Sequence, residues 1–198
     1  TIVTWTVTDG SGNVASTTQT ITVSDLINPI IVAPATVNAN ANSGCVAFDV
    51  NLGVPTVSDN CTIASVTNNA PNTFTLGTTT VTWTATDASG NVATATQTVI
   101  VSDVTAPSLV VPSNVTVNVN NACTATGVTL GSPVTSDNCS VASVTNNAPV
   151  IFNIGTTIVT WTVTDPSGNV TTGTQPVTVL DSTFPTIIAP SNISIVAT

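Results

Sequence analysis

The clearest pattern in the chain is an alternation of apolar and polar residues around a tryptophan. Val81, Trp83 and Ala85 share one face of an extended chain, and the threonines between them share the other. Residues 87–91, Asp-Ala-Ser-Gly-Asn, have the composition of a tight turn. Residues 91–101 then read as a return strand. The pattern therefore predicts an antiparallel hairpin that directs the tryptophan toward a core.

This hairpin pattern occurs three times, with Trp5, Trp83 and Trp161 each 78 residues apart. The four cysteines keep the same interval, as do eight of the nine acidic residues, all of which are aspartate. A period of this length fits a small autonomous domain. The predicted organisation is the last two strands of a preceding repeat (1–25), two complete repeats (26–103 and 104–181) and the first strand of a following repeat (182–198).

Shorter β-strands are expected in the rest of each repeat. In the first complete repeat they fall at about 30–37, 45–51, 62–67 and 73–76, between turn signals. Thr and Val, which favour strands, dominate, and helix-favouring Glu, Lys, Arg and Met are absent. Roughly seven short strands per repeat predict an all-β fold of tandem immunoglobulin-like β-sandwiches. We expect Trp5, Trp83 and Trp161 to form the cores.

Composition narrows the function. The chain has no Lys, Arg or His and a formal net charge of −9. Nucleic acid binding depends on cationic side chains, and a basic membrane-binding patch is equally impossible. No stretch reaches the ~18–20 consecutive apolar residues of a membrane span, so neither nucleic acid binding nor membrane insertion is expected. Serine and cysteine nucleophiles need a neighbouring base, for which only aspartate is present. The acidic balance indicates cations as partners.

The cysteines indicate disulfides. Cys45 and Cys61 lie 16 residues apart, and so do Cys123 and Cys139. An even number at repeated spacing suggests one disulfide within each repeat, Cys45–Cys61 and Cys123–Cys139, formed in an oxidising compartment. A zinc site would need four soft ligands, and each repeat offers two cysteines and no histidine.

The chain resembles the HYR domain (hyalin repeat) family along its whole length. Three segments of the first complete repeat carry the resemblance: Pro-x-x-x-Asp-Asn-Cys at 55–61, a Gly-Thr-Thr to Ser-Gly-Asn stretch at 77–91, and Asp-x-x-x-Pro at 103–107. Many members also have a Cys-Pro near the domain start, but here the residue before that Pro is Ala33, Val111 or Ala189. The resemblance implies extracellular immunoglobulin-like modules of adhesion proteins, including large secreted bacterial adhesins and surface filaments.

Most aspartates fall where loops of an immunoglobulin-like topology should meet. We expect Asp59 and Asn60, between two strands, to approach Asp87 and the linker residue Asp25. Carboxylates without a basic partner repel one another, and calcium, which binds six to eight oxygens, would relieve this repulsion. The alternative is that each aspartate only caps its own turn. The full set of candidate calcium ligands is Asp25, Asp59, Asn60, Asp87, Asp103, Asp137, Asn138 and Asp165.

The sequence leaves three functions to compare. The favoured one is a non-enzymatic structural or spacer repeat of an extracellular adhesin or surface filament, with further copies of the repeat and cell-surface or filament proteins as partners. The second is a glycan- or protein-binding module acting directly in adhesion, which would need exposed aromatic side chains, whereas aromatics are only 4% of the chain. The third is a hydrolase using paired aspartates, which would require the aspartates to face a groove.

Overall fold

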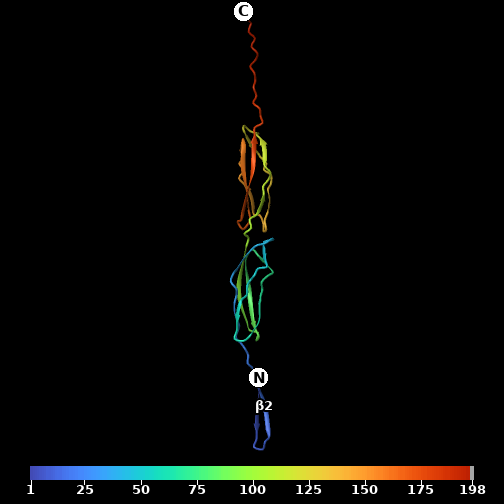
Figure 1. Cartoon of the computed structure of the whole chain (residues 1–198), viewed down its shortest axis with the longest axis vertical. Coiled ribbons are helices and arrows are strands. Elements are labelled where there is room, and N and C mark those ends of the chain that lie inside the picture. Colours follow the sequence, from blue (N-terminus) through green and yellow to red (C-terminus); the bar gives the residue numbers. More distant parts are fainter. Residues whose placement is uncertain (197–198) are drawn as a thin grey trace. The chain divides into compact units, whose positions relative to one another are not determined.

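The computed structural model describes residues 1–196 and divides the chain into two compact units (Figure 1). The first unit comprises Thr1–Asn42 and Val46–Ser102, and the second comprises Ser43–Cys45 together with the chain from Asp103 onward. Regular secondary structure in the described residues consists of β-strands. The predicted fold class, all-β with tandem immunoglobulin-like sandwiches, is confirmed by the strand order of both units.

The first unit contains a hairpin and one complete sandwich. Its strands are β1 (Ile2–Thr8), β2 (Val14–Thr20), β3 (Ile30–Val32), β4 (Val37–Asn40), β5 (Val46–Phe48), β6 (Thr56–Ser58), β7 (Ile63–Asn68), β8 (Thr73–Thr75), β9 (Gly77–Asp87) and β10 (Val92–Ser102). One sheet has the order β4-β10-β9-β7, in which β4 runs parallel to β10. The pairs β3–β6 and β5–β8 form the second layer. This is the A′-G-F-C sheet facing an A-B-E layer, with β5 and β6 as two halves of strand B.

The second unit repeats this topology. Its strands are β11 (Ser108–Val110), β12 (Val115–Asn118), β13 (Thr124–Thr126), β14 (Val134–Ser136), β15 (Ser143–Asn146), β16 (Ile151–Asn153), β17 (Gly155–Thr164) and β18 (Val170–Leu180). The sheet order is β12-β18-β17-β15, and β11–β14 and β13–β16 form the other layer. The long hairpin of β17 and β18 places Trp161 opposite Gly173, as β9 and β10 place Trp83 opposite Ala95.

The core of each sandwich lies on the apolar face of its long hairpin. Val81 and Ala85 are fully buried, and Trp83 between them is 7% exposed. In the second unit Trp161 is 6% exposed and packs with Val159, Val177 and Phe152. The face that the alternation directs inward is therefore the buried one in both complete repeats.

A buried glutamine fastens each tryptophan to the opposite layer. The indole N–H of Trp83 donates to Gln97 Oε1 at 3.0 Å, and Gln97 Nε2 donates to the carbonyls of Ala35 and Leu52 at 2.9 and 2.8 Å. Gln175, which is fully buried, makes the same three bonds in the second unit. Each glutamine thus satisfies one donor and two acceptors that would otherwise be buried without partners.

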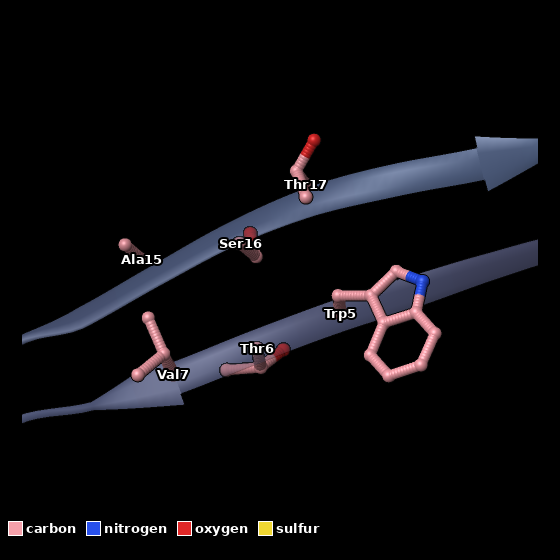
Figure 2. Close-up of a pocket in the computed structure, with 6 residues that line it drawn as sticks. All are labelled: Trp5, Thr6, Val7, Ala15, Ser16 and Thr17. Atoms are coloured by element: carbon pink, nitrogen blue, oxygen red, sulfur yellow. The ribbon is translucent and has the colours of Figure 1, made fainter.

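The prediction that Trp5 is a core residue is wrong for this structure. Trp5 lies on the hairpin of β1 and β2 and is 61% exposed, although its indole still donates to Gln19 Oε1 at 3.0 Å. Trp5 pairs with Thr17 of β2, Val7 pairs with Ala15, and these four residues help to line an open hollow of about 330 Å³ (Figure 2). In the complete repeats, strands of the second layer cover the equivalent face, and the described residues hold none for this hairpin. We therefore interpret the hollow as an uncovered core face.

The expected first strand of a following repeat is also not formed. Residues 182–196 carry no strand, and the last part of that predicted segment, 197–198, lies outside the described residues. In the complete repeats the corresponding strands, β3 and β11, pair with β6 and β14. Among the described residues, no strand pairs with 182–196.

The disulfide pairing differs from the prediction. The structure joins Cys45 to Cys139, 94 residues apart, and leaves Cys61 and Cys123 as exposed free thiols. The expected bonds within repeats, Cys45–Cys61 and Cys123–Cys139, are therefore wrong.

The reason lies in the path of strand B. Cys45 lies just before β5 and four residues after Ala41. The N–H of Ala41 bonds to the carbonyl of Ser102, so this part of the chain lies at the end of β10. Cys61 follows β6, beside the turn that precedes β10, where Ala88 N–H bonds to the carbonyl of Thr62. Strand β10 has 11 residues, which span about 35 Å at roughly 3.3 Å per residue. A disulfide requires Cα atoms within about 7 Å, so these two cysteines cannot bond to each other.

The buried glutamines can be tested against an exposed counterpart. Gln175→Leu would strand the indole N–H of Trp161 and two carbonyls, each at a cost of about 1–3 kcal/mol. We expect the free energy of unfolding measured with urea to fall by about 3 kcal/mol or more. Gln19→Leu removes the same bond from exposed Trp5, and we expect a change below about 0.5 kcal/mol. Equal effects of the two substitutions would contradict this account.

Candidate metal centre

Three aspartates of the first unit come from separate segments and meet at one end of the sandwich. Asp25 lies in the segment before β3, Asp59 follows β6, and Asp87 ends β9. Carboxylate oxygens of all three lie within 4.8 Å of one another. We call this set the first aspartate cluster. These are the three aspartates that the sequence, through its expected topology, predicted to approach one another.

Each of these aspartates caps its own turn with one carboxylate oxygen. Asp25 Oδ1 accepts the N–H of Ile27 at 3.0 Å, and Asp59 Oδ2 accepts the N–H of Cys61 at 2.9 Å. Asp87 Oδ1 accepts two backbone N–H groups, from Ser89 at 2.9 Å and Asn91 at 2.8 Å. Turn capping, the alternative to metal binding, therefore accounts for one oxygen of each aspartate.

Turn capping leaves two oxygens of the cluster unexplained. Asp25 Oδ2 and Asp59 Oδ1 are buried and have no hydrogen-bond partner. The remaining oxygen of Asp87 accepts the side-chain N–H of Asn91 at 2.7 Å. Buried carboxylate oxygens without a donor are costly and rare in folded proteins. The protein has no Lys, Arg or His to place beside these two oxygens, so a positive partner would have to come from outside the chain.

Two asparagines hold the cluster together. Asn60 Nδ2 donates to Asp25 Oδ1 at 3.2 Å, so this predicted ligand acts in the structure as a brace between two loops. Asn91 Nδ2 donates both to Asp87 and to the backbone carbonyl of Asp25 at 3.2 Å. Asn91 was not predicted as a site residue. Its place four residues after Asp87, at the end of the Asp-x-Ser-Gly-Asn motif, is the signal that could have identified it.

The second unit builds a related site from Asp103 and Asp137, the second aspartate cluster. Their carboxylates and the Sγ of Cys139 lie within 4.8 Å of one another, and Asp103 is 7% exposed. Asp103 Oδ2 and Asp137 Oδ1 are buried without partners, as in the first cluster. Cys139 is in the disulfide, so its sulfur is not a thiolate ligand. The same pair of oxygens is thus left over in both units.

The other residues predicted for this site act through hydrogen bonds. Asn138 Nδ2 donates to Asp103 Oδ1 at 3.2 Å. Asp165 is not part of the second aspartate cluster. Its carboxylate accepts the side-chain N–H of Asn169 at 2.7 Å. Asn169 also donates to the backbone carbonyl of Asp103 at 3.2 Å. Asp165 is therefore linked to the second cluster through Asn169, another residue that the sequence did not single out.

Hydrogen bonds favour the ionised form of three of these aspartates, Asp25, Asp87 and Asp165. Hydrogen bonds from the N–H of Ile27 and the side chain of Asn60 hold the pKa of Asp25 below its usual value. Burial raises the pKa of Asp87, but bonds from the side chain and backbone of Asn91 outweigh it and lower the pKa overall. The pKa of Asp165 is lowered in the same way. No Lys, Arg or His is available in the chain to neutralise these charges.

Two further aspartates show what turn capping alone looks like. Asp9 accepts the N–H groups of Ser11 and Asn13, both at 2.9 Å, in a turn like that of Asp87. Asp181 accepts the N–H of Thr183 at 2.9 Å, as Asp25 does with Ile27. Both are exposed, and among the described residues neither belongs to a group of three or more candidate metal ligands. They serve as internal controls for the clusters.

Comparison with known proteins identifies the repeat. The family model of the HYR domain matches residues 24–101 and 102–179. The chain belongs to the HYR domain family. Within residues 1–196, no helix is long and apolar enough to cross a membrane.

Two curated relatives carry the name Hyalin. The protein from Strongylocentrotus purpuratus is 37% identical over 185 residues, covering 87% of this chain and 15% of the relative. The protein from Lytechinus variegatus is 36% identical over 202 residues, covering 94% of this chain and 38% of the relative. This HYR chain therefore spans well under half of each relative. Both relatives are sea urchin proteins, so they do not support the bacterial source that the resemblance implied.

Solved structures with a similar fold include cadherins. Drosophila N-cadherin EC1-4 has a TM-score of 0.42 and 12% identity, covering 78% of this chain and 50% of that chain. PcdhgB3 EC1-4 has a TM-score of 0.40 and 14% identity, covering 92% and 57%. We draw no functional conclusion from likenesses at this level.

Acid should weaken the fold through these carboxylates. Because Asp25, Asp87 and Asp165 have lowered pKa values in the folded state, they stabilise it above the unfolded value of about 3.9. This contribution is lost as the pH falls through the lower folded values. In chelator, we expect the melting temperature to be level from pH 7 to pH 5 and to fall below about pH 4. A melting temperature unchanged down to pH 2 would contradict the lowered pKa values.

Proposed function

We propose that this chain is a structural, non-enzymatic segment of an extracellular protein that acts in adhesion or surface assembly, and that calcium binds at its two aspartate clusters. The observation that carries the calcium proposal is the pair of buried, unpartnered carboxylate oxygens present in each unit. The adhesive and structural role is supported by the tandem HYR repeats and by the relatives named Hyalin.

An extracellular location is supported by the cysteine chemistry. The structure contains a disulfide, and disulfides persist mainly in oxidising compartments outside the cytosol. The absence of basic residues also means that proteases specific for Lys and Arg find no cleavage site in this chain. Both features suit a protein exposed to the extracellular medium.

Calcium fits the donor set of the clusters. It takes six to eight hard oxygen ligands at about 2.3–2.6 Å, from carboxylates, carbonyls and water, in flexible geometry. In the first cluster Asp25 Oδ2 and Asp59 Oδ1 are the free carboxylate oxygens. An open groove of about 470 Å³, lined in part by Asp25, Asn60 and Ser89, borders the cluster and would supply water ligands. Softer metals are disfavoured because the donors are oxygens.

The aspartates are better suited to binding a cation than to catalysis. Asp87 is 2% exposed and all of its turn bonds hold it ionised, so it would be a poor general acid near neutral pH. The chain has no histidine to act as a base. The two core tryptophans are buried, so they offer no aromatic platform for a glycan.

Calorimetric melting of the 198-residue chain tests the calcium proposal. Extracellular calcium modules bind with Kd values of about 0.1–1 mM. At 10 mM calcium, a site of about 0.1 mM would stabilise its unit by about 2.7 kcal/mol. Since 1 kcal/mol shifts the melting temperature of a domain this size by about 4–8 °C, we expect a rise of about 10 °C or more over chelator.

Matched variants assign the effect to the clusters. The double variant Asp59→Asn/Asp137→Asn removes one free carboxylate oxygen from each cluster and should abolish most of the rise. The double variant Asp49→Asn/Asp181→Asn removes the same charge from exposed positions outside the clusters and should keep it. If calcium stabilised both variants equally, or did not stabilise the parent chain, the clusters would not be calcium sites.

A further inference from the structure

The observed disulfide joins two different positions of the 78-residue repeat, so the same bond can be sought between other repeats. Cys45 and Cys123 are equivalent under the 78-residue period, and so are Cys61 and Cys139. The bond Cys45–Cys139 therefore joins the first cysteine of one repeat to the second cysteine of the next. By the same rule, Cys61 would bond to the first cysteine of the repeat before it, and Cys123 to the second cysteine of the repeat after it. Residues 1–198 contain neither of these partners.

We propose that Cys61 and Cys123 each form a disulfide of the same kind with a neighbouring repeat, so that successive repeats are joined by a ladder of disulfides. Cys61 would pair with the first cysteine of a preceding repeat, and Cys123 with the second cysteine of a following repeat. The partner is thus another HYR repeat that carries the same two cysteines.

The free Cys61 already has the setting of its bonded equivalent. The N–H of Cys61 donates to Asp59 Oδ2 at 2.9 Å, and that of Cys139 donates to Asp137 Oδ2 at 2.8 Å. The side chain of the preceding asparagine contacts the sulfur in both cases, at 3.5 Å for Cys61 and 3.7 Å for Cys139. Cys61 is exposed, so its sulfur is accessible to a partner thiol.

The free Cys123 likewise matches Cys45. Both cysteines adopt the left-handed backbone conformation, with φ of 63° and 60°. Both follow a strand that ends in a turn with an equivalent bond: Asn42 N–H to the Val46 carbonyl at 2.8 Å, and Asn120 N–H to the Thr124 carbonyl at 2.9 Å. The turn around Cys123 has two more backbone bonds, between Asn121 and Thr124 at 3.2 and 2.9 Å. The turns also differ in that Ala122, with φ of 31°, stands where the first repeat has Gly44, with φ of 78°.

The chemistry of each bond is a thiol–disulfide exchange with a small-molecule disulfide such as oxidised glutathione. The two protein thiols lose two protons and two electrons and form one S–S bond. The oxidant's own S–S bond breaks, and it leaves as two thiols. Exchange requires accessible thiols, which both free cysteines are.

The ladder would give the array a short covalent path. Between successive bonds this path runs only through residues 45–61, which are strand B and its ends. The 16 residue-to-residue steps from Cys45 to Cys61 extend to about 53 Å at roughly 3.3 Å each, whereas a 78-residue repeat that unravelled would extend to about 260 Å. A ladder would thus prevent an array under tension from lengthening by unfolding.

The test adds one repeat to the full chain. In a variant with residues 26–103 duplicated in place, the second copy of Cys61 gains a preceding first cysteine. The protein is oxidised with a glutathione redox buffer, its remaining thiols are alkylated, and it is cleaved on the amino side of aspartate. This cleavage places the four cysteines of the parent chain on separate peptides, 25–48, 59–86, 103–136 and 137–164, and the duplicated repeat adds a second copy of the first two.

The ladder predicts a new cross-linked product, peptide 25–48 joined to 59–86, in addition to 25–48 joined to 137–164. The parent chain should give only the latter, with Cys61 and Cys123 alkylated. Replacing Cys45 by Ser in the first copy alone should remove the new product and keep the other, which also reports correct folding. The proposal is overturned if Cys61 of the duplicated chain is fully alkylated while 25–48 joined to 137–164 forms, or if the new product survives that substitution.

Discussion

The main constraint on this structure is the repulsion between clustered aspartates, which the chain has no basic side chain to neutralise. Nine aspartates are the only ionised side chains in the sequence, and no Lys, Arg or His is present to pair with any of them. Most are nonetheless kept ionised or held in turns by backbone and asparagine N–H groups, which stabilise the carboxylate form. In two places the fold brings carboxylate oxygens of aspartates, three in one place and two in the other, within 4.8 Å of one another and buries part of their surface. Such an arrangement costs free energy unless an external cation is present.

The long hairpin of each repeat explains how this repulsion arises. Its apolar face forms the core, with Trp83 or Trp161 fastened by a buried glutamine. Its turn places Asp87 or Asp165 at the end of the sandwich where the chain enters the repeat. The asparagine at the end of that turn reaches back to the backbone of Asp25 or Asp103. Core packing and the position of the acidic groups are thus set by the same two strands.

Much of this could be predicted from sequence, because local patterns determine it. The alternation around Trp83 specifies the hairpin, and the expected immunoglobulin topology brings Asp25, Asp59 and Asp87 to one end. The disulfide could not be predicted in this way. A separation of 16 residues looks short in sequence, but strand B is extended and carries Cys45 and Cys61 to opposite ends. The prediction that Trp5 is buried was wrong because burial requires a second layer of strands, which the described residues do not provide for that hairpin.

The number of calcium ions bound by the full chain tests the central claim most directly. Native mass spectrometry or isothermal titration of the chelator-treated, oxidised protein would count them. Two aspartate clusters predict two saturable sites per chain. Absence of saturable binding at millimolar calcium would contradict the account and would leave the clustered aspartates as turn caps whose mutual repulsion the fold simply tolerates.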